Sequence, residues 1–173
     1  MKRVVLFLIC VLTFLSFGIE AEANFESWKQ GIDEVVIEVG EIYGNRIELA
    51  ANEHQGVEKI DLWSVIVVES NGNSGAISET NVQGLTMLTL DVVNLIRDET
   101  GIVIDRNHPF EAMWGAGWYL SHLRSRYDYS IDEAHAAYYL GPGGLESKLE
   151  NSSLEDVYHL KKINHVKNII KNL

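Results

Sequence analysis

Glu69 occupies a position in the sequence that suits an acid catalyst. It ends an almost unbroken apolar run, Ile60–Val68, and the loop that follows it is rich in glycine, serine and asparagine. If the run is helical, Val65 and Ile66 lie one turn before Glu69 and place its carboxyl on an apolar surface. Burial disfavours the charged form of a carboxyl and raises its pKa, as a general acid near neutral pH requires. The ordinary alternative is a glutamate at a helix end that points into water.

Other residues could carry different chemistry, but their spacing favours it less. Ordinary glycoside hydrolysis uses paired carboxylates; the nearest partners for Glu69 are Glu79 and Asp91, and both are better interpreted as surface charges. The six histidines show no His-x-x-x-His spacing and no accompanying cysteines, so neither a metal site nor another cofactor is expected. His135 could line a cleft, although a packed helix histidine is the more ordinary interpretation.

The apolar periodicity predicts that helices position Glu69. Apolar side chains recur at helical spacing, and strand-like alternation is nearly absent. We expect one central helix over 57–69 and an irregular loop over 70–83. The other predicted helices span 25–51, 85–97, a segment that begins at Pro109, 131–140 and 154–173, with Gly141–Gly144 ending the helix over 131–140. The fold class is therefore predicted to be mainly α, in a single compact helical domain.

The first residues have the pattern of a secretory signal peptide. Lys2 and Arg3 precede an apolar segment over 4–17, and Ala21-Glu22-Ala23 offers the small residues that a signal peptidase recognises. We expect cleavage after Ala23, which leaves one domain over 24–173 in a secreted or periplasmic protein without a stable membrane span. An uncleaved N-terminal anchor is the alternative. Because Cys10 is the only cysteine, the mature chain would contain no disulfide.

The charge distribution argues against some partners. A net charge of −11 disfavours nucleic acid, because phosphates need a basic surface. Acidic residues gather over 26–61, and the last predicted helix carries four lysines, Lys161, Lys162, Lys167 and Lys171. Both sets are interpreted as solvated helix faces. The basic helix could alternatively dock a partner.

Three short motifs resemble those of one enzyme family. The run Glu69–Ser78 is similar to E-S-x-x-[ND]-P-x-A-x-S, Gly84-Leu85 to the start of G-L-M-Q, and Ala137–Gly143 to A-Y-N-A-G-P-G. These motifs are typical of lytic transglycosylases of the soluble, goose-lysozyme-like type. The resemblance covers about 62–144 and implies a lysozyme-like helical domain, with the motifs in a core of about 57–150 and a C-terminal helix over about 154–172.

The resemblance also implies an activity. Members of this family cleave the MurNAc-β-1,4-GlcNAc bond of the peptidoglycan glycan strand without water. By analogy, Glu69 would protonate the glycosidic oxygen and then act as base while the C6 hydroxyl attacks C1, leaving a 1,6-anhydro end. Ser78 would hold the N-acetylmuramoyl unit, and Tyr138 would position the carboxyl. A domain of this size fits a local opener of the wall that serves a secretion, conjugation or phage-entry machinery.

The sequence departs from the family pattern at positions that should face the substrate. Met87 replaces the glutamine of G-L-M-Q, and a thioether cannot supply the hydrogen bonds of an amide. Tyr139 replaces the asparagine of A-Y-N. A divergent active enzyme is the main interpretation. The alternatives are a catalytically weak or inactive glycan-binding or assembly protein of the same fold, and a hydrolytic muramidase.

Overall fold

The computed structural model describes residues 22–173, in two units that are treated separately. In the first unit, residues 22–29 are helical and a turn follows at 30–31, where Gly31 has a left-handed φ of 77°. The prediction of one unbroken helix over 25–51 is therefore wrong, since a new helix, α2, begins at Ile32 and runs to Asn52. The predicted signal peptide falls almost wholly outside the described residues, so its cleavage after Ala23 stays a prediction.

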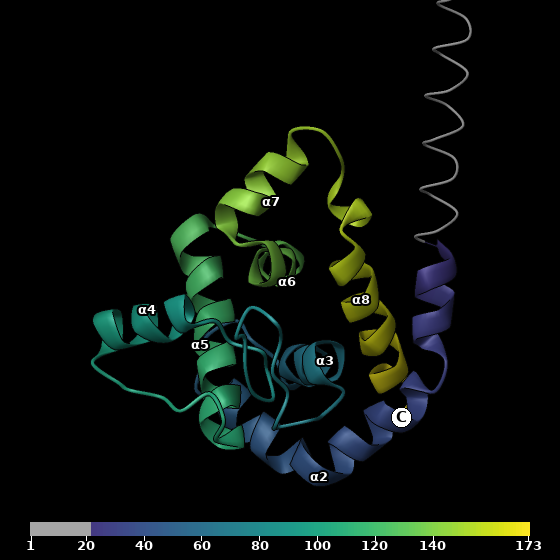
Figure 1. Ribbon diagram of the computed structural model, residues 1–173, viewed down its shortest axis with the longest axis horizontal. Coiled ribbons are helices and arrows are strands. Elements are labelled where there is room, and N and C mark those ends of the chain that lie inside the picture. The colour runs from purple at the N-terminus through teal and green to yellow at the C-terminus, as the bar shows by residue number, and fades with distance from the viewer. Residues whose placement is uncertain (1–21) are drawn as a thin grey trace, which may run out of the picture. The chain divides into compact units, whose positions relative to one another are not determined.

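The second unit, residues 34–173, is built from helices, which confirms the predicted fold class (Figure 1). After α2 come α3 (Lys59–Ser70), α4 (Leu90–Thr100), α5 (Pro109–Tyr127), α6 (Ile131–Leu140), α7 (Pro142–Leu149), the 3-10 turn η1 (Leu154–Asp156) and α8 (Tyr158–Lys171). Within residues 22–173 there is no strand, only isolated bridges that join Gln83 to Ile77 and Leu88. No helix in this described range is long and apolar enough to span a bilayer.

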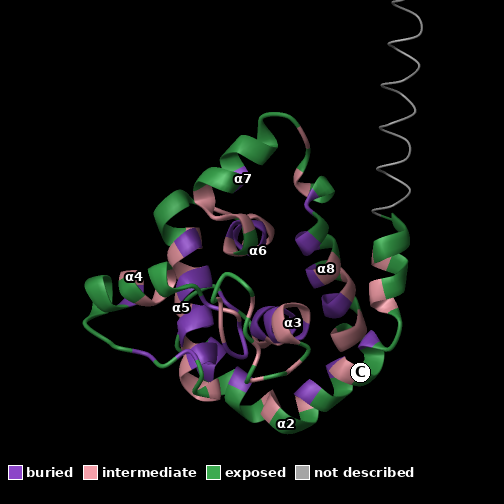
Figure 2. Ribbon diagram, in the orientation of Figure 1, coloured by how far each residue is buried: buried purple, intermediate pink, exposed green. Residues whose placement is uncertain are grey.

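Helix α3 is the central element, as the apolar run predicted. Four of its apolar side chains are completely buried, namely Leu62, Val65, Ile66 and Val67. Helices α5, α6 and α8 pack around it, and α2 is fixed to it by the Trp63 indole, which donates a hydrogen bond of 3.1 Å to the Val36 carbonyl (Figures 1 and 2). The C-terminal end of α3 is thus held from several sides.

Further helix boundaries differ from the sequence-based expectation. The helix predicted over 154–173 begins only at Tyr158, after the 3-10 turn η1. The helix predicted over 85–97 begins only at Leu90, with Thr89 as its cap, because residues 84–88 form a tight turn with left-handed Gly84 and Met87. The Gly141–Gly144 segment does end α6 at Leu140, but it also begins a further helix, α7. Pro142 occupies the first position of α7, where its missing N–H costs nothing.

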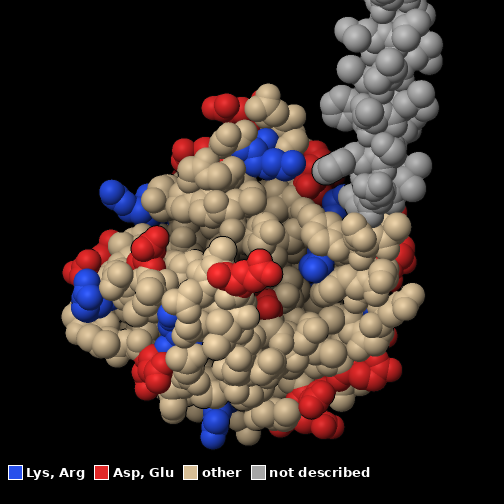
Figure 3. Space-filling model, viewed as in Figure 1, with Lys and Arg blue, Asp and Glu red and all other residues tan. Residues whose placement is uncertain are grey.

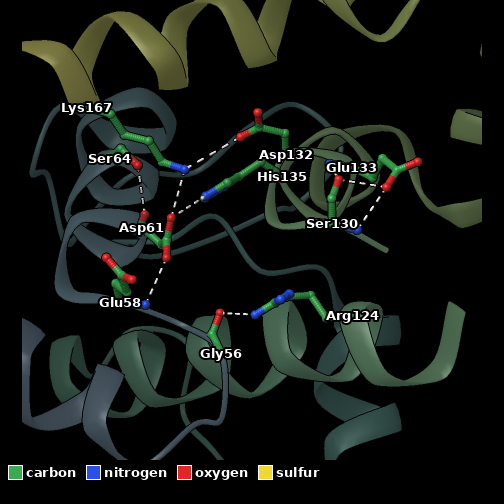
Figure 4. A network of polar contacts seen from close by, with 10 residues as sticks. All are labelled: Gly56, Glu58, Asp61, Ser64, Arg124, Ser130, Asp132, Glu133, His135 and Lys167. Atoms are coloured by element: carbon green, nitrogen blue, oxygen red, sulfur yellow. Dashed lines mark hydrogen bonds and ion pairs between the residues drawn. The ribbon is translucent and has the colours of Figure 1, made fainter. Parts of the chain in front are cut away.

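Charged side chains follow the sequence pattern only in part. Figure 3 shows acidic residues gathered over α2, in agreement with a solvated acidic face. The interpretation of the C-terminal lysines as solvated is wrong for Lys167, which is 8% exposed. Its Nζ atom lies 2.8 Å from Oδ1 of Asp61 in α3, and Nε2 of the fully buried His135 in α6 lies 3.2 Å from the same oxygen (Figure 4). One buried ionic network therefore joins α3, α6 and α8.

Candidate active site

Glu69 lies in the last turn of α3, with its side chain 13% exposed. The helix ends one residue later, where Asn71 adopts a left-handed φ of 52° and donates its N–H to the Val67 carbonyl at 3.0 Å. Burial raises the pKa of Glu69 to about 8, against the opposing charge of Lys162 in α8. The direction of this shift agrees with the expectation that apolar surroundings favour the protonated carboxyl, and the catalytic role of Glu69 stays a prediction.

A tight turn over residues 84–88 lies next to the end of α3 and is held by three helices. The Ser70 hydroxyl of α3 donates to the Leu85 carbonyl at 2.6 Å. The Thr86 hydroxyl donates to the Ala112 carbonyl of α5 at 3.0 Å, and the Tyr138 hydroxyl of α6 donates to the Thr86 carbonyl at 2.7 Å. These bonds fix the turn relative to Glu69, which precedes Ser70 directly.

Gly84 is required at the start of this turn. Its φ of 85° is left-handed, and a Cβ at this position would collide with the Arg106 carbonyl. The buried Arg106 guanidinium in turn donates to the carbonyls of Asn81 and Leu88, at 3.0 and 2.9 Å. The glycine of the G-L motif therefore allows two backbone segments to lie in contact.

Tyr138 lies close enough to Glu69 for their charges to interact. Burial, and after it the charge of Glu69, raise the pKa of Tyr138 well above its usual value. Because its hydroxyl donates a hydrogen bond to the Thr86 carbonyl, the Tyr138 side chain is attached to the turn over 84–88. Its predicted role in positioning the carboxyl stays a prediction.

Two further residues of the predicted substrate site lie in the loop between α3 and α4. Ser78 is half-buried, and its hydroxyl accepts the Val82 N–H at 3.0 Å, so it closes the turn of its own loop. Met87 is half-buried with a left-handed φ of 49°, a conformation that costs a side chain about 1 to 2 kcal/mol. Backbone strain of this kind concentrates at functional sites. Their contact with substrate stays a prediction.

Sequence reasoning missed His159, a residue that lies against Glu69. His159 comes from α8, and its Nε2 atom lies 3.2 Å from Oε1 of Glu69. Tyr139 stacks on the imidazole, with ring centroids 4.6 Å apart and planes 3° from parallel. The signal was present in the sequence, because His159 stands four residues before Ile163 on the apolar face of the last helix.

The charge states of Glu69 and His159 follow from their burial. A separation of 3.2 Å alone would suit an ion pair. Removal from water, however, raises the pKa of Glu69 to about 8 and lowers the pKa of His159 to about 3, so both groups favour their neutral forms. We therefore describe the pair as a protonated carboxyl beside a neutral imidazole.

The weaker candidates lie away from this arrangement. Glu79 and Asp91, the possible second carboxylates, are both exposed. His135 is fully buried and contacts Asp61, which agrees with a packed histidine. A cavity of about 760 Å³ lies beside Asp61 and Lys167, and Asp61 precedes Glu69 by two helical turns, roughly 12 Å along α3.

The chain was compared with known protein families and with curated proteins. Residues 47–160 match the model of the transglycosylase SLT domain. The chain belongs to this family. The SLT domain so defined contains Glu69, the loop with Ser78 and Met87, and the stacked pair of Tyr139 and His159. The resemblance inferred from the three motifs is thus confirmed.

A similar curated protein is the membrane-bound lytic murein transglycosylase F 1 of Alkalilimnicola ehrlichii. It is 34% identical to this chain over 110 residues, which cover 60% of this chain and 21% of the relative. The chain therefore matches about a fifth of that protein's length. The name of that relative refers to murein.

Proposed function

We propose that this SLT domain is a peptidoglycan lytic transglycosylase and that Glu69 is its sole general acid and base. The observation that carries the proposal is the buried carboxyl with a pKa of about 8, which holds a proton at neutral pH. Burial and Lys162 are the causes that shift this pKa, and the two candidate second carboxylates, Glu79 and Asp91, are exposed. This arrangement favours a mechanism with one carboxyl over hydrolysis with two.

The proposed reaction returns the enzyme to its starting state without water. Glu69 donates its proton to the oxygen between MurNAc and GlcNAc, and the bond from C1 of MurNAc to that oxygen breaks. The Glu69 carboxylate then removes the proton of the C6 hydroxyl as its oxygen bonds to C1. The products are a 1,6-anhydroMurNAc end and a free GlcNAc hydroxyl, with the carboxyl protonated again. No cofactor takes part in these steps.

The neighbouring residues have supporting roles in this proposal. Ser78 holds the N-acetylmuramoyl unit, and Tyr138 fixes the turn over 84–88, and with it the end of α3, through its bond to Thr86. Met87 and Tyr139 line the substrate side. Such preorganised contacts stabilise an oxocarbenium-like transition state.

Product analysis tests the proposed chemistry. We expect purified peptidoglycan digested with the mature protein to yield 1,6-anhydromuropeptides in mass spectra, and we expect Glu69→Gln to yield none. Glu79→Gln serves as the matched control, because it removes an exposed carboxylate ten residues later, and it should give the same products as the wild type.

The other outcomes identify the rival functions. Reducing MurNAc ends would show a hydrolytic muramidase. No products, together with retained binding in a peptidoglycan pelleting assay, would show a glycan-binding or assembly protein of the same fold. Loss of products in Glu79→Gln would contradict a mechanism with one carboxyl.

Restoring the family residue at position 87 should strengthen substrate binding. We expect Met87→Gln to lower KM for soluble glycan strands about 5- to 10-fold, because an amide can make the hydrogen bonds to a sugar that a thioether lacks. Steady-state kinetics on the same strands measure the change. An unchanged or higher KM would show that Met87 does not face the substrate.

Export is part of the proposal, because peptidoglycan lies outside the cytoplasm. We propose that the chain is secreted or periplasmic after cleavage behind Ala23, and that it opens the wall locally for a secretion, conjugation or phage-entry machinery. Protein sequencing of the exported form should begin at Asn24. A form that retains Met1 would indicate an uncleaved anchor instead.

A further inference from the structure

A histidine from the last helix lies against the proposed catalytic carboxyl. We propose that His159 is a positioning residue for Glu69. Its Nε2 atom accepts a hydrogen bond from the protonated carboxyl, and Tyr139 keeps the imidazole in place. This inference rests on the proposed function of Glu69. It adds α8, which lies outside the three sequence motifs, to the active site.

The geometry of the contact carries the inference. Nε2 of His159 lies 3.2 Å from Oε1 of Glu69, and the two side chains are 8% and 13% exposed. The Nε2 atom is buried with no hydrogen-bond partner in the described part of the chain, and the Glu69 carboxyl lies beside it. A buried imidazole nitrogen without a partner is costly, so its position at a carboxyl oxygen calls for a function.

Tyr139 keeps the imidazole in this position. Its ring lies parallel to that of His159, with centroids 4.6 Å apart, while its own side chain is 62% exposed. The phenol therefore covers one face of the imidazole on the solvent side. An asparagine, the residue of the family pattern at this position, could not form this ring stack.

The groups around the pair favour a neutral imidazole. Burial first, and then the nearby charges of His135 in α6 and Lys162 in α8, lower the pKa of His159 to about 3. Tyr138, a further titratable group near Glu69, keeps its proton because its pKa is raised. A neutral imidazole has one nitrogen with a free lone pair, and that nitrogen can accept a hydrogen bond from the protonated Glu69 carboxyl.

This arrangement fits both halves of the proposed reaction. The imidazole orients the carboxyl while the proton passes from Glu69 to the glycosidic oxygen. It remains neutral beside the carboxylate until the C6 hydroxyl returns a proton. His159 therefore gains and loses no proton over the cycle, and its contribution is to orientation and to the proton affinity of Glu69.

Replacement of His159 by phenylalanine tests the proposal, because Phe keeps a ring on Tyr139 and removes the nitrogens. We expect kcat on soluble glycan strands to fall about 10- to 100-fold with little change in KM. The high-pH limb of the kcat profile should move to lower pH, because a proton held between two acceptors is bound more tightly than a proton on one.

The chain offers a closely matched control at His122. Its imidazole stacks on Trp118, with centroids 4.8 Å apart, and its Nδ1 lies 3.2 Å from a carboxylate oxygen of Glu99. His122→Phe thus removes the same kind of contact at a distance from Glu69, and it should leave kcat and the pH profile unchanged. An equal loss in both variants, or a His159→Phe variant that lowers only the melting temperature, would overturn the proposal.

A nuclear magnetic resonance titration separates this proposal from the proposed function. In the wild type, the Glu69 carboxyl carbon and the His159 ring nitrogens should respond at the same pH. Because the pKa of His159 is about 3, protonation of the imidazole itself is expected in a separate step at acidic pH. His159 ring nitrogens that do not respond when Glu69 titrates would overturn the pairing. The readout needs neither catalytic activity nor a folded variant, so it decides the role of His159 even if the digestion experiment fails or His159→Phe does not fold.

Discussion

The Glu69→Gln variant is expected to cleave peptidoglycan at least about 100-fold more slowly than the wild type. It is also expected to become more stable than the wild type as the pH rises. The loss of rate follows because an amide cannot donate a proton to the glycosidic oxygen or accept one from the C6 hydroxyl. The gain in stability follows from the raised pKa of Glu69. The same burial that makes this residue an acid makes it costly to the fold.

The sign of the stability change can be worked out from the pKa. The folded value is about 8 and the unfolded value is 4.5. Below pH 4.5 the carboxyl is protonated in both the folded and the unfolded state, so its ionisation does not affect the free energy of unfolding. As the pH rises toward 8, the unfolded chain ionises and the folded chain does not, so the wild type loses roughly 3 kcal/mol of stability by pH 7. The Gln amide does not titrate, so its cost of burial stays constant.

Urea denaturation at pH 5, 6, 7 and 8 measures this difference. The free energy of unfolding of Glu69→Gln, minus that of the wild type, should increase steadily with pH. Glu79→Gln removes an exposed carboxylate in the adjacent loop, and its difference from the wild type should stay flat. A flat difference for Glu69→Gln would show that the Glu69 carboxyl is not protonated in the folded state at neutral pH.

The central part of the fold could be predicted from local sequence pattern. The apolar run before Glu69 predicted a covered helix, and the structure buries Leu62 and Val65–Val67 completely. The polar, glycine-rich segment after it predicted an irregular loop, and residues 71–89 are free of helix. These features depend on spacing within one segment, which is what a periodicity analysis measures.

The features that the sequence did not predict depend on contacts between distant segments. Lys167 has the composition of a surface lysine, and only the approach of Asp61 from α3 explains its burial. His159 is close to Glu69 because α8 packs along α3, a contact across ninety residues of sequence. The left-handed turn at Met87 is likewise fixed by bonds from three other helices. Periodicity identifies a buried face but not its partner.

The Asp61→Ala variant is expected to lose about 3 to 5 kcal/mol of stability, because it leaves a buried lysine without its counter-ion. Oδ1 of Asp61 lies 2.8 Å from Nζ of Lys167 and 3.2 Å from Nε2 of His135, and Oδ2 accepts the Glu58 N–H at 2.8 Å (Figure 4). Burial opposes the charge of Asp61, but the hydrogen bonds from His135 and Lys167 outweigh it and hold the pKa well below its usual range.

Asp132→Ala is the matched control, since Asp132 also faces Lys167 but at 3.8 Å and with 46% of its side chain exposed. Because Asp132 is exposed and the contact is long, we expect it to contribute less than about 1 kcal/mol. The pKa of Asp61 is lower in the folded state than in the unfolded state, where it is 3.8. The ionised carboxylate therefore contributes fully to the free energy of unfolding above pH 3.8, and this contribution is lost as the pH falls below that value. In urea denaturation experiments, the loss of unfolding free energy caused by Asp61→Ala should therefore become smaller below pH 4.

The same network should determine whether α8 remains in the active site. Asp61 joins α3 to α6 and α8, which carry Glu69, Tyr139 and His159. We expect the double variant Asp61→Leu/Lys167→Met to regain much of the lost stability, because an apolar pair avoids the cost of removing charges from water. It should also regain the rate on glycan strands, since α8 again packs on α3. Equal losses of stability in Asp61→Ala and Asp132→Ala would instead show that the buried contact contributes no more than the exposed one.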